Sequence, residues 1–116
     1  MIRATTTQTE ATLAHHMQAL GAGQLDELLS DYTEGSVLFS TFGRSHGLAE
    51  IRAFFETTLK TMPGMVAAFQ MVRQDVEGET AYIVWKAEPY VLMGSDTFVV
   101  RDGKIMVQTV ATYMPS

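Results

Sequence analysis

The sequence predicts a single α+β domain, spanning residues 1–116, in which one curved sheet wraps around helices. Two observations predict this fold class. Apolar residues recur at helical spacing through most of the first half, whereas the chain after residue 64 alternates as strands do and carries clear turn signals. A length of 116 residues with 47% hydrophobic side chains allows one core. Helices gathered before consecutive strands are typical of α+β domains.

The first half is expected to hold two helices before any strand. Thr7 and Glu10 have the spacing of a capping box, so the first helix is expected to start there and to end at residues 21–23, which include two glycines. Its inner stripe consists of Leu13, Met17 and Leu20. A short second helix is expected next. Its stripe consists of Leu25, Leu28, Leu29 and Tyr32.

One strand and a third helix are expected next. Residues 37–39 are rich in β-formers and too short for a helix, so they predict a strand. Residues 43–47 are expected to form a turn or an irregular link. A third helix is predicted from Leu48, and Met62-Pro63-Gly64 ends it.

Four strands are expected in the second half, paired antiparallel in chain order. They cover residues 65–76, 80–88, 91–101 and 104–113. Asp102-Gly103 is a strong signal for a two-residue hairpin between the last two strands. The predicted order is therefore ααβαββββ.

Composition excludes several classes of partner. A net charge of −5 argues against nucleic-acid binding and against a basic membrane-surface helix. The chain has no cysteine, no apolar run of membrane-spanning length and no phosphate-binding glycine motif. His15 and His16 are adjacent, so their side chains diverge on a helix and cannot converge on one ion. We therefore expect a cytoplasmic protein that needs neither a metal nor a cofactor.

Asp96 is the most informative candidate for chemistry. Strand alternation groups it with Leu92, Phe98 and Val100. If that face is the concave one, the carboxyl group lies among apolar side chains and its pKa is raised, which suits a general acid or base. The alternative places Asp96 on the convex face, in water or at a dimer contact.

His16 is the second candidate, because it lies on the inner stripe of the first helix, three residues after Leu13 and four before Leu20. A histidine facing a cavity can donate a hydrogen bond to a carbonyl oxygen or move a proton near pH 7. The alternative is a structural histidine that hydrogen-bonds Tyr32 or a backbone carbonyl.

Further side chains are expected to line an apolar pocket and orient a ligand's oxygen atoms. The polar candidates are Ser40, Thr41, Gln108 and Thr112. The apolar candidates are Met17, Phe39, Phe54, Phe55, Met65, Met71, Ile83, Trp85, Met93 and Phe98. Small hydroxyls in strands and methionines in cores are also common packing residues.

Local sequence runs resemble a known family. The runs are residues 28–37, Phe42-Gly43, His46-Gly47 with the helix that follows, and two pieces of the last hairpin, residues 103–105 and 111–113. In this order and at this length, the chain resembles the nuclear transport factor 2-like superfamily, which includes SnoaL-like polyketide cyclases and ketosteroid isomerases. The resemblance covers nearly the whole chain and implies a cone-shaped sheet around the helices.

The resemblance to ketosteroid isomerases implies roles for five positions; that family uses an aspartate base and an oxyanion hole of tyrosine plus protonated aspartate. Tyr32 and Asp96 match the supporting tyrosine and the oxyanion-hole aspartate. His16 stands where the family has the oxyanion tyrosine, Phe55 where it has a second tyrosine, and Ser40 where it has the general base. Since Ser40 cannot accept a proton as a carboxylate does, ordinary steroid isomerisation is not expected.

We expect a protein that binds a small hydrophobic carbonyl compound of steroid or polyketide type. If it is an enzyme, its chemistry is cofactor-free proton transfer, with Asp96 as acid or base, His16 as donor or second base, and Tyr32 orienting them. The remaining hypotheses are a non-catalytic binding module and a dimerisation module. A homodimer is expected through the convex sheet face, where Tyr82, Val84 and other apolar residues project.

Overall fold

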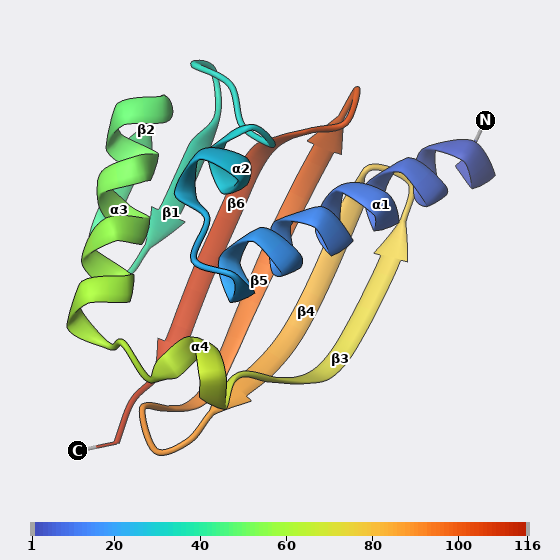
Figure 1. Ribbon diagram of the computed structural model, residues 1–116. Coiled ribbons are helices and arrows are strands. Elements are labelled where there is room, and N and C mark those ends of the chain that lie inside the picture. The colour runs from blue at the N-terminus through green and yellow to red at the C-terminus, as the bar shows by residue number, and fades with distance from the viewer. Residues whose placement is uncertain (1, 116) are drawn as a thin grey trace.

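A computed structural model describes residues 2–115 and contains one six-stranded sheet with the helices on one of its faces (Figure 1). The helices are α1 (Ile2–Gly21), α2 (Leu25–Leu29), α3 (Leu48–Thr61) and α4 (Met65–Ala68). The strands are β1 (Val37–Ser40), β2 (Gly43–His46), β3 (Gln70–Glu77), β4 (Thr80–Ala87), β5 (Val91–Arg101) and β6 (Lys104–Tyr113). The α+β class and the helix-then-sheet order are thus confirmed.

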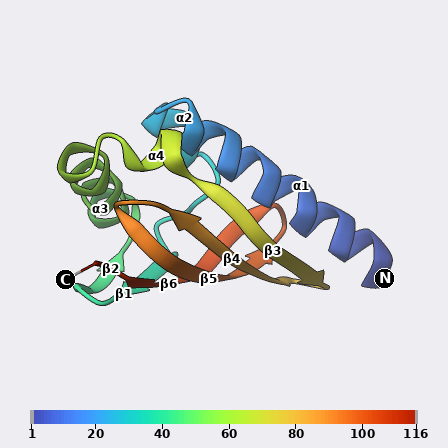
Figure 2. The same ribbon diagram turned by 90° about the horizontal axis from the view of Figure 1, so that it is seen from below.

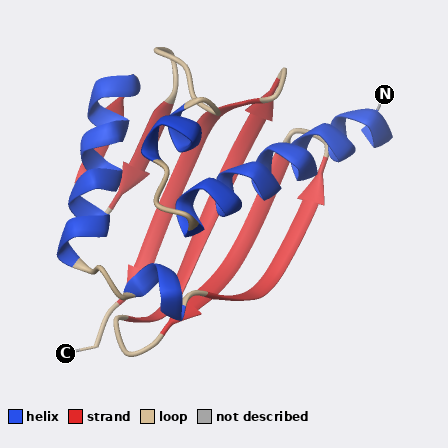
Figure 3. Cartoon of the chain, in the orientation of Figure 1, coloured by secondary structure: helices blue, strands red, loops and turns tan. Residues whose placement is uncertain are grey.

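The sheet curves around the helices, as the view from below shows (Figure 2). Its strand order is β2-β1-β6-β5-β4-β3. Helix α1 crosses β3, β4 and β5, whereas α3 packs at the opposite edge against β2 (Figure 3). The sheet is mixed rather than wholly antiparallel, because β1 pairs in parallel with the C-terminal strand β6.

Helix α1 begins before Thr7, so the predicted capping box is wrong. Threonine side chains anchor the early turns to the turn between β3 and β4. The Thr9 hydroxyl donates to the Gly78 carbonyl at 2.6 Å, and the Gly78 amide donates to the Thr6 hydroxyl at 2.9 Å. These contacts join residues about 70 positions apart in the sequence. A local capping pattern therefore cannot predict them.

Two further elements differ from the sequence prediction. Residues 43–46 form strand β2, which pairs antiparallel with β1, instead of an irregular link. Residues 65–68 form the short helix α4 instead of the start of a strand. Met65 of α4 is buried in the core, so this turn of helix closes the end of the molecule between α3 and β3. Tyr32, expected on the second helix, lies just beyond α2.

The final hairpin forms as its sequence predicts. Asp102 and Gly103 both have positive φ, 52° and 74°, as a tight two-residue turn requires. Arg101 and Lys104 pair directly across this turn. The pairing next to the turn therefore follows from local sequence, whereas the register shifts between Val99 and Val100.

The core fills the space between the sheet and the helices. Its fully buried members include Leu13 of α1, Leu38 of β1, Ile51 of α3 and Ile105 of β6. Helix α3 starts at Leu48, whose amide donates to the Glu34 carboxylate at 2.8 Å. This hydrogen bond joins the start of α3 to the segment between α2 and β1. It helps to position α3, whose residues form part of the cavity wall.

Candidate functional site

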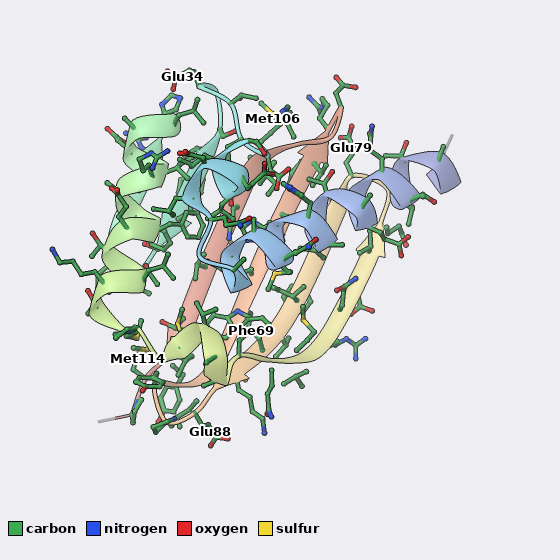
Figure 4. The ribbon with its side chains drawn as sticks, viewed as in Figure 1. Glu34, Phe69, Glu79, Glu88, Met106 and Met114 are labelled. Atoms are coloured by element: carbon green, nitrogen blue, oxygen red, sulfur yellow. The ribbon has the colours of Figure 1, made fainter. Side chains whose placement is uncertain are left out.

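A cavity of about 350 Å³ lies between the helices and the concave face of the sheet. Most of its wall is apolar. It reaches the surface at Phe42, which is 92% exposed, and at Met114 in the C-terminal segment. Figure 4 shows Met114 and Phe69, another wall residue, at the same end of the molecule beside α4.

Asp96 of β5 is the acidic group of this cavity, and side chains of the two neighbouring strands, β4 and β6, hydrogen-bond to it. Trp85 Nε1 donates to Asp96 Oδ1 at 2.9 Å, and Gln108 Nε2 donates to Asp96 Oδ2 at 3.0 Å. Trp85 can reach across β5 because its cross-strand partner is Gly94, where an added Cβ would lie 2.4 Å from the indole. Phe69 stacks on the same indole with ring centroids 5.1 Å apart.

Burial raises the pKa of Asp96 from 3.8 to about 6, and the two hydrogen bonds oppose that rise. Desolvation dominates because no cationic side chain contacts the carboxyl among the described residues. A carboxyl group with this pKa changes its protonation state near neutrality, which suits it to proton transfer.

A chain of hydrogen bonds leads from Asp96 to His16. The Gln108 amide, whose Nε2 contacts Asp96, accepts a hydrogen bond at Oε1 from the Tyr32 hydroxyl. The Tyr32 oxygen lies 3.4 Å from His16 Nδ1. All four side chains are buried, so each polar group depends on the next for its hydrogen bond.

His16 is a neutral histidine. Burial lowers its pKa to about 4, and the neighbouring His15 adds a smaller effect in the same direction. The imidazole packs edge-on against Phe98 and Phe55, with ring centroids 5.3 and 6.0 Å away. These aromatic contacts and Tyr32 fix the orientation of the ring in the cavity wall.

The structure brings most of the predicted site residues to this cavity. The predicted residues that line it are His16, Met17, Ser40, Thr41, Phe54, Phe55, Met65, Trp85, Asp96, Gln108 and Thr112. Tyr32 and Phe98 lie behind the wall and contact His16.

Other predicted wall residues lie elsewhere. Phe39, Met71 and Met93 are exposed, because each points to the side of the sheet or the edge that the helices do not cover. Leu92 is exposed too, although its alternation matches that of Asp96. The pairing of β4 with β5 is irregular between Trp85 and residue 87, and the irregularity turns Val91 inward in place of Leu92.

Sequence reasoning missed Phe69, Val91 and Gly94 as determinants of the site. Phe69 and Val91 line the cavity, and their positions depend on α4 and on the irregular pairing described above. Gly94 did carry a signal, since a glycine inside a strand marks close approach of another group.

His15 points away from the cavity and pairs with Asp31 and Glu27, at 2.7 and 2.9 Å. Within residues 2–115, no group of three or more histidine, aspartate or glutamate side chains is arranged to hold a metal ion. No helix in this described part is long and apolar enough to span a bilayer.

Comparison with known proteins identifies the family. The profile of the SnoaL-like domain matches residues 13–108, which is most of the chain. The chain belongs to the SnoaL-like domain family. No curated protein matches this SnoaL-like domain in sequence.

Solved structures share the same fold. An NTF2-like protein of unknown function from Mesorhizobium loti superposes with a TM-score of 0.79 at 20% identity, covering 93% of each chain. A SnoaL-like protein of unknown function from Burkholderia thailandensis superposes with a TM-score of 0.75 at 17% identity, covering 92% of this chain and 95% of that one. These likenesses show that the SnoaL-like domain shares the fold of these proteins.

Proposed function

We propose that this SnoaL-like domain binds a small hydrophobic carbonyl compound, of steroid or polyketide type, and catalyses proton transfer on it without a cofactor. The observation that carries the proposal is the presence of an ionisable carboxyl, Asp96, and a neutral imidazole, His16, in the wall of one apolar cavity. Ligand pockets of this kind combine an apolar wall with a few fixed polar groups.

Asp96 has the properties of the acid–base group in such a reaction. With a pKa of about 6 it is mainly ionised at pH 7, and it is basic enough to take a proton from a carbon next to a carbonyl group. The same group then returns the proton to another carbon of the ligand, so no net proton is consumed. His16 is the second polar group that faces the ligand, and Tyr32 positions it from behind.

The remaining wall residues shape and orient the ligand. Phe54, Phe55 and Trp85 supply apolar contact, whereas Ser40 and Thr112 add hydroxyl groups near the ligand's oxygen atoms. Phe98 packs against the His16 ring behind the cavity wall and is not one of the lining residues. The volume of about 350 Å³ is at the lower end of the range for ligand pockets, roughly 300–1,000 Å³, and fits a fused-ring ketone.

Binding can be measured with the protein's own fluorescence. Trp85 is the only tryptophan in the sequence and lies in the cavity wall. Titration with 2-tetralone or a 3-oxo steroid is expected to change its emission saturably. A Val110→Phe variant, which fills the cavity from β6, is expected to abolish this change. Equal responses of the two proteins would contradict binding in the cavity.

Catalysis can be tested on the same ketone in D₂O by following deuterium incorporation next to the carbonyl by NMR. The wild-type protein is expected to accelerate exchange, and Asp96→Asn is expected to lose the acceleration. An Asp75→Asn variant, which removes an exposed carboxyl on β3, is the matched control and is expected to behave as wild type. Acceleration that survives Asp96→Asn would refute the assigned role.

A non-catalytic ligand-binding role is the second candidate, and Ser40 favours it. Ser40 lies in the cavity wall where the resemblance to ketosteroid isomerases implies a general-base aspartate. Its hydroxyl instead accepts the Phe42 amide at 3.2 Å and stabilises the turn between β1 and β2. Saturable binding of the ketone without any deuterium exchange would select this role.

We also propose that a second copy of the chain covers the convex face of the sheet. Phe39, Tyr82 and Thr97 lie in one row across this face, because Phe39 pairs with Thr109, Thr109 with Thr97, and Thr97 with Tyr82. Phe39 and Tyr82 are exposed on it. Sedimentation of the wild type as a dimer and of a Tyr82→Lys variant as a monomer is expected; a wild-type monomer at tens of micromolar refutes it.

A further inference from the structure

The hydrogen-bond chain between Asp96 and His16 has a defined direction. A tyrosine hydroxyl carries one hydrogen, and that of Tyr32 points to Gln108 Oε1. The contact between the Tyr32 oxygen and His16 Nδ1 is a hydrogen bond only if Nδ1 carries the proton of the neutral ring. His16 lines the cavity, and its Nε2 is then unprotonated and can only accept a hydrogen bond. The cavity therefore meets a hydrogen-bond acceptor at His16.

This direction belongs to the ionised form of Asp96, whose Oδ2 accepts from the Gln108 amide. Trp85 Nε1 can only donate, so Oδ1 is always an acceptor. A proton on Oδ2, the oxygen that faces Gln108, leaves the contact between Trp85 and Oδ1 unchanged and turns Oδ2 into a donor toward the Gln108 amide. The amide of Gln108 then has to present its oxygen to Asp96. A 180° rotation of the amide group achieves this, and the side chain keeps nearly the same shape because the oxygen and the NH₂ group are similar in size.

The half-turn reverses every bond in the chain. The Gln108 NH₂ group then donates to the Tyr32 oxygen, the Tyr32 hydroxyl donates to His16 Nδ1, and the ring proton of His16 sits on Nε2. The two states differ by one proton in total, which is the one on Asp96. His16 is neutral in both, with its single ring proton on Nδ1 in the first state and on Nε2 in the second.

We propose that Gln108 couples the protonation state of Asp96 to the tautomer of His16, so that the cavity offers hydrogen-bond acceptors to its ligand when Asp96 is ionised and a donor at His16 when Asp96 is neutral. This inference depends on the proposed function only in that the cavity is taken to bind a ligand. Gln108 is thus a positioning residue that acts through His16. The ionised state selects a ligand with an O–H group, such as an enol or a phenol, and the neutral state selects a carbonyl oxygen.

The surroundings leave Asp96 as the group that drives this change. The charged or titratable neighbours of His16 are Tyr32, whose burial raises its pKa well above 10, and His15, which is held by Asp31 and Glu27 on the other side of α1. Phe55 and Phe98 face His16 from α3 and β5 and do not titrate. His16 itself has a pKa of about 4 and stays neutral where Asp96, with a pKa of about 6, changes state.

The ring nitrogens of His16 report the switch directly in the protein without ligand. In protein labelled with ¹⁵N-histidine, long-range ¹H–¹⁵N spectra between pH 5 and 8 distinguish protonated from unprotonated nitrogens. We expect Nδ1 to be protonated at pH 8 and Nε2 at pH 5, with a midpoint equal to that of the Asp96 carboxyl carbon. A single tautomer throughout the titration of Asp96, or uptake of a second proton by His16, would overturn the proposal.

Three variants sharpen the test. Asp96→Asn places an NH₂ group opposite Gln108, because Trp85 still requires the oxygen, and is expected to lock the Nε2-protonated form at every pH. Tyr32→Phe removes the middle of the chain, so Asp96 titrates while the tautomer of His16 no longer follows it. His15→Gln is the matched control outside the chain and is expected to keep the switch. Retention of the switch in Tyr32→Phe overturns the coupling.

The selection of ligand can be measured by calorimetry with 2-naphthol and 2-naphthaldehyde, which differ mainly in donating or accepting. Raising the pH from 5 to 7.5 is expected to shift their affinity ratio toward naphthol by about 2- to 10-fold, the worth of one hydrogen bond. An unchanged ratio together with an observed tautomer switch refutes the ligand selection. Failure of both compounds to bind at either pH argues against the proposed function and leaves the apo measurement to decide the coupling.

Discussion

Replacing Asp96 with asparagine is expected to stabilise the protein at neutral pH. The folded state raises the pKa of Asp96 from 3.8 to about 6, so the folded protein holds this proton more tightly than the unfolded chain. Stability is therefore unaffected by this group below about pH 4, falls as the pH rises toward 6, and stays reduced above that. At about 1.4 kcal/mol per pH unit, the reduction at neutral pH is about 3 kcal/mol.

Asparagine has nearly the same shape, keeps an oxygen for Trp85 and never ionises. Its free energy of unfolding should exceed that of the wild type by up to about 3 kcal/mol at pH 7.5 and match it near pH 4. The hydrogen bonds from Trp85 and Gln108 to the carboxylate are already included, because they limit the rise of the pKa. Turnover is expected to weaken in the same variant, because asparagine cannot take a proton from the ligand.

Urea unfolding of both proteins at pH 4 and pH 7.5 provides the measurement. With slopes of about 1–3 kcal/mol/M, a difference of this size moves the midpoint by about 1 M or more. Asp75→Asn, which removes an exposed carboxyl, is the control and should change stability by less than about 0.5 kcal/mol at both pH values. If Asp96→Asn and the wild type show the same dependence on pH, the carboxyl is not held in the way described.

Two further changes test the frame of the site. Gly94→Ala should destabilise the fold by about 1–3 kcal/mol and shift the fluorescence of Trp85, because the added Cβ would lie 2.4 Å from the indole. An unchanged emission spectrum would show that the indole does not cross Gly94. Leu38→Ala, at a fully buried site in β1, should cost about 2–5 kcal/mol in urea unfolding, and a loss below 1 kcal/mol would contradict the packing of β1 against the core.

Where geometry is local, the sequence alone was enough. Asp102 and Gly103 specify a tight turn by their tolerance of positive φ, and this fixes the pairing of β5 with β6 up to the irregularity between Val99 and Val100. Alternation along β5 groups Val100, Phe98 and Asp96 on one face, and the fold makes that face the inner one. The helical period likewise places His16 on the inner side of α1. The turn and the grouping along each element follow from backbone sterics within a few residues.

The tertiary structure decided what depends on distant partners. The start of α1 is helical because its threonine side chains hydrogen-bond to the turn at Gly78. Residues 43–46 form a strand because they pair with β1. The inward turn of Val91 follows from the irregular pairing of β4 with β5. Local propensity is weak beside such contacts, so short segments adopt the conformation that their neighbours satisfy.

The site shows the same division between local and distant causes. Asp96 and His16 are recognisable as candidates in the sequence, because the period of each element groups them with apolar residues. Only the fold decided that the sheet face carrying Asp96 is the one that lines the cavity. Their connection through Gln108 and Tyr32 is not recognisable in the sequence, since the Tyr32 hydroxyl and the Gln108 amide belong to residues 76 positions apart. A buried hydrogen bond forms only where the fold brings donor and acceptor within about 3 Å, and the direction of the whole chain then depends on one proton at Asp96.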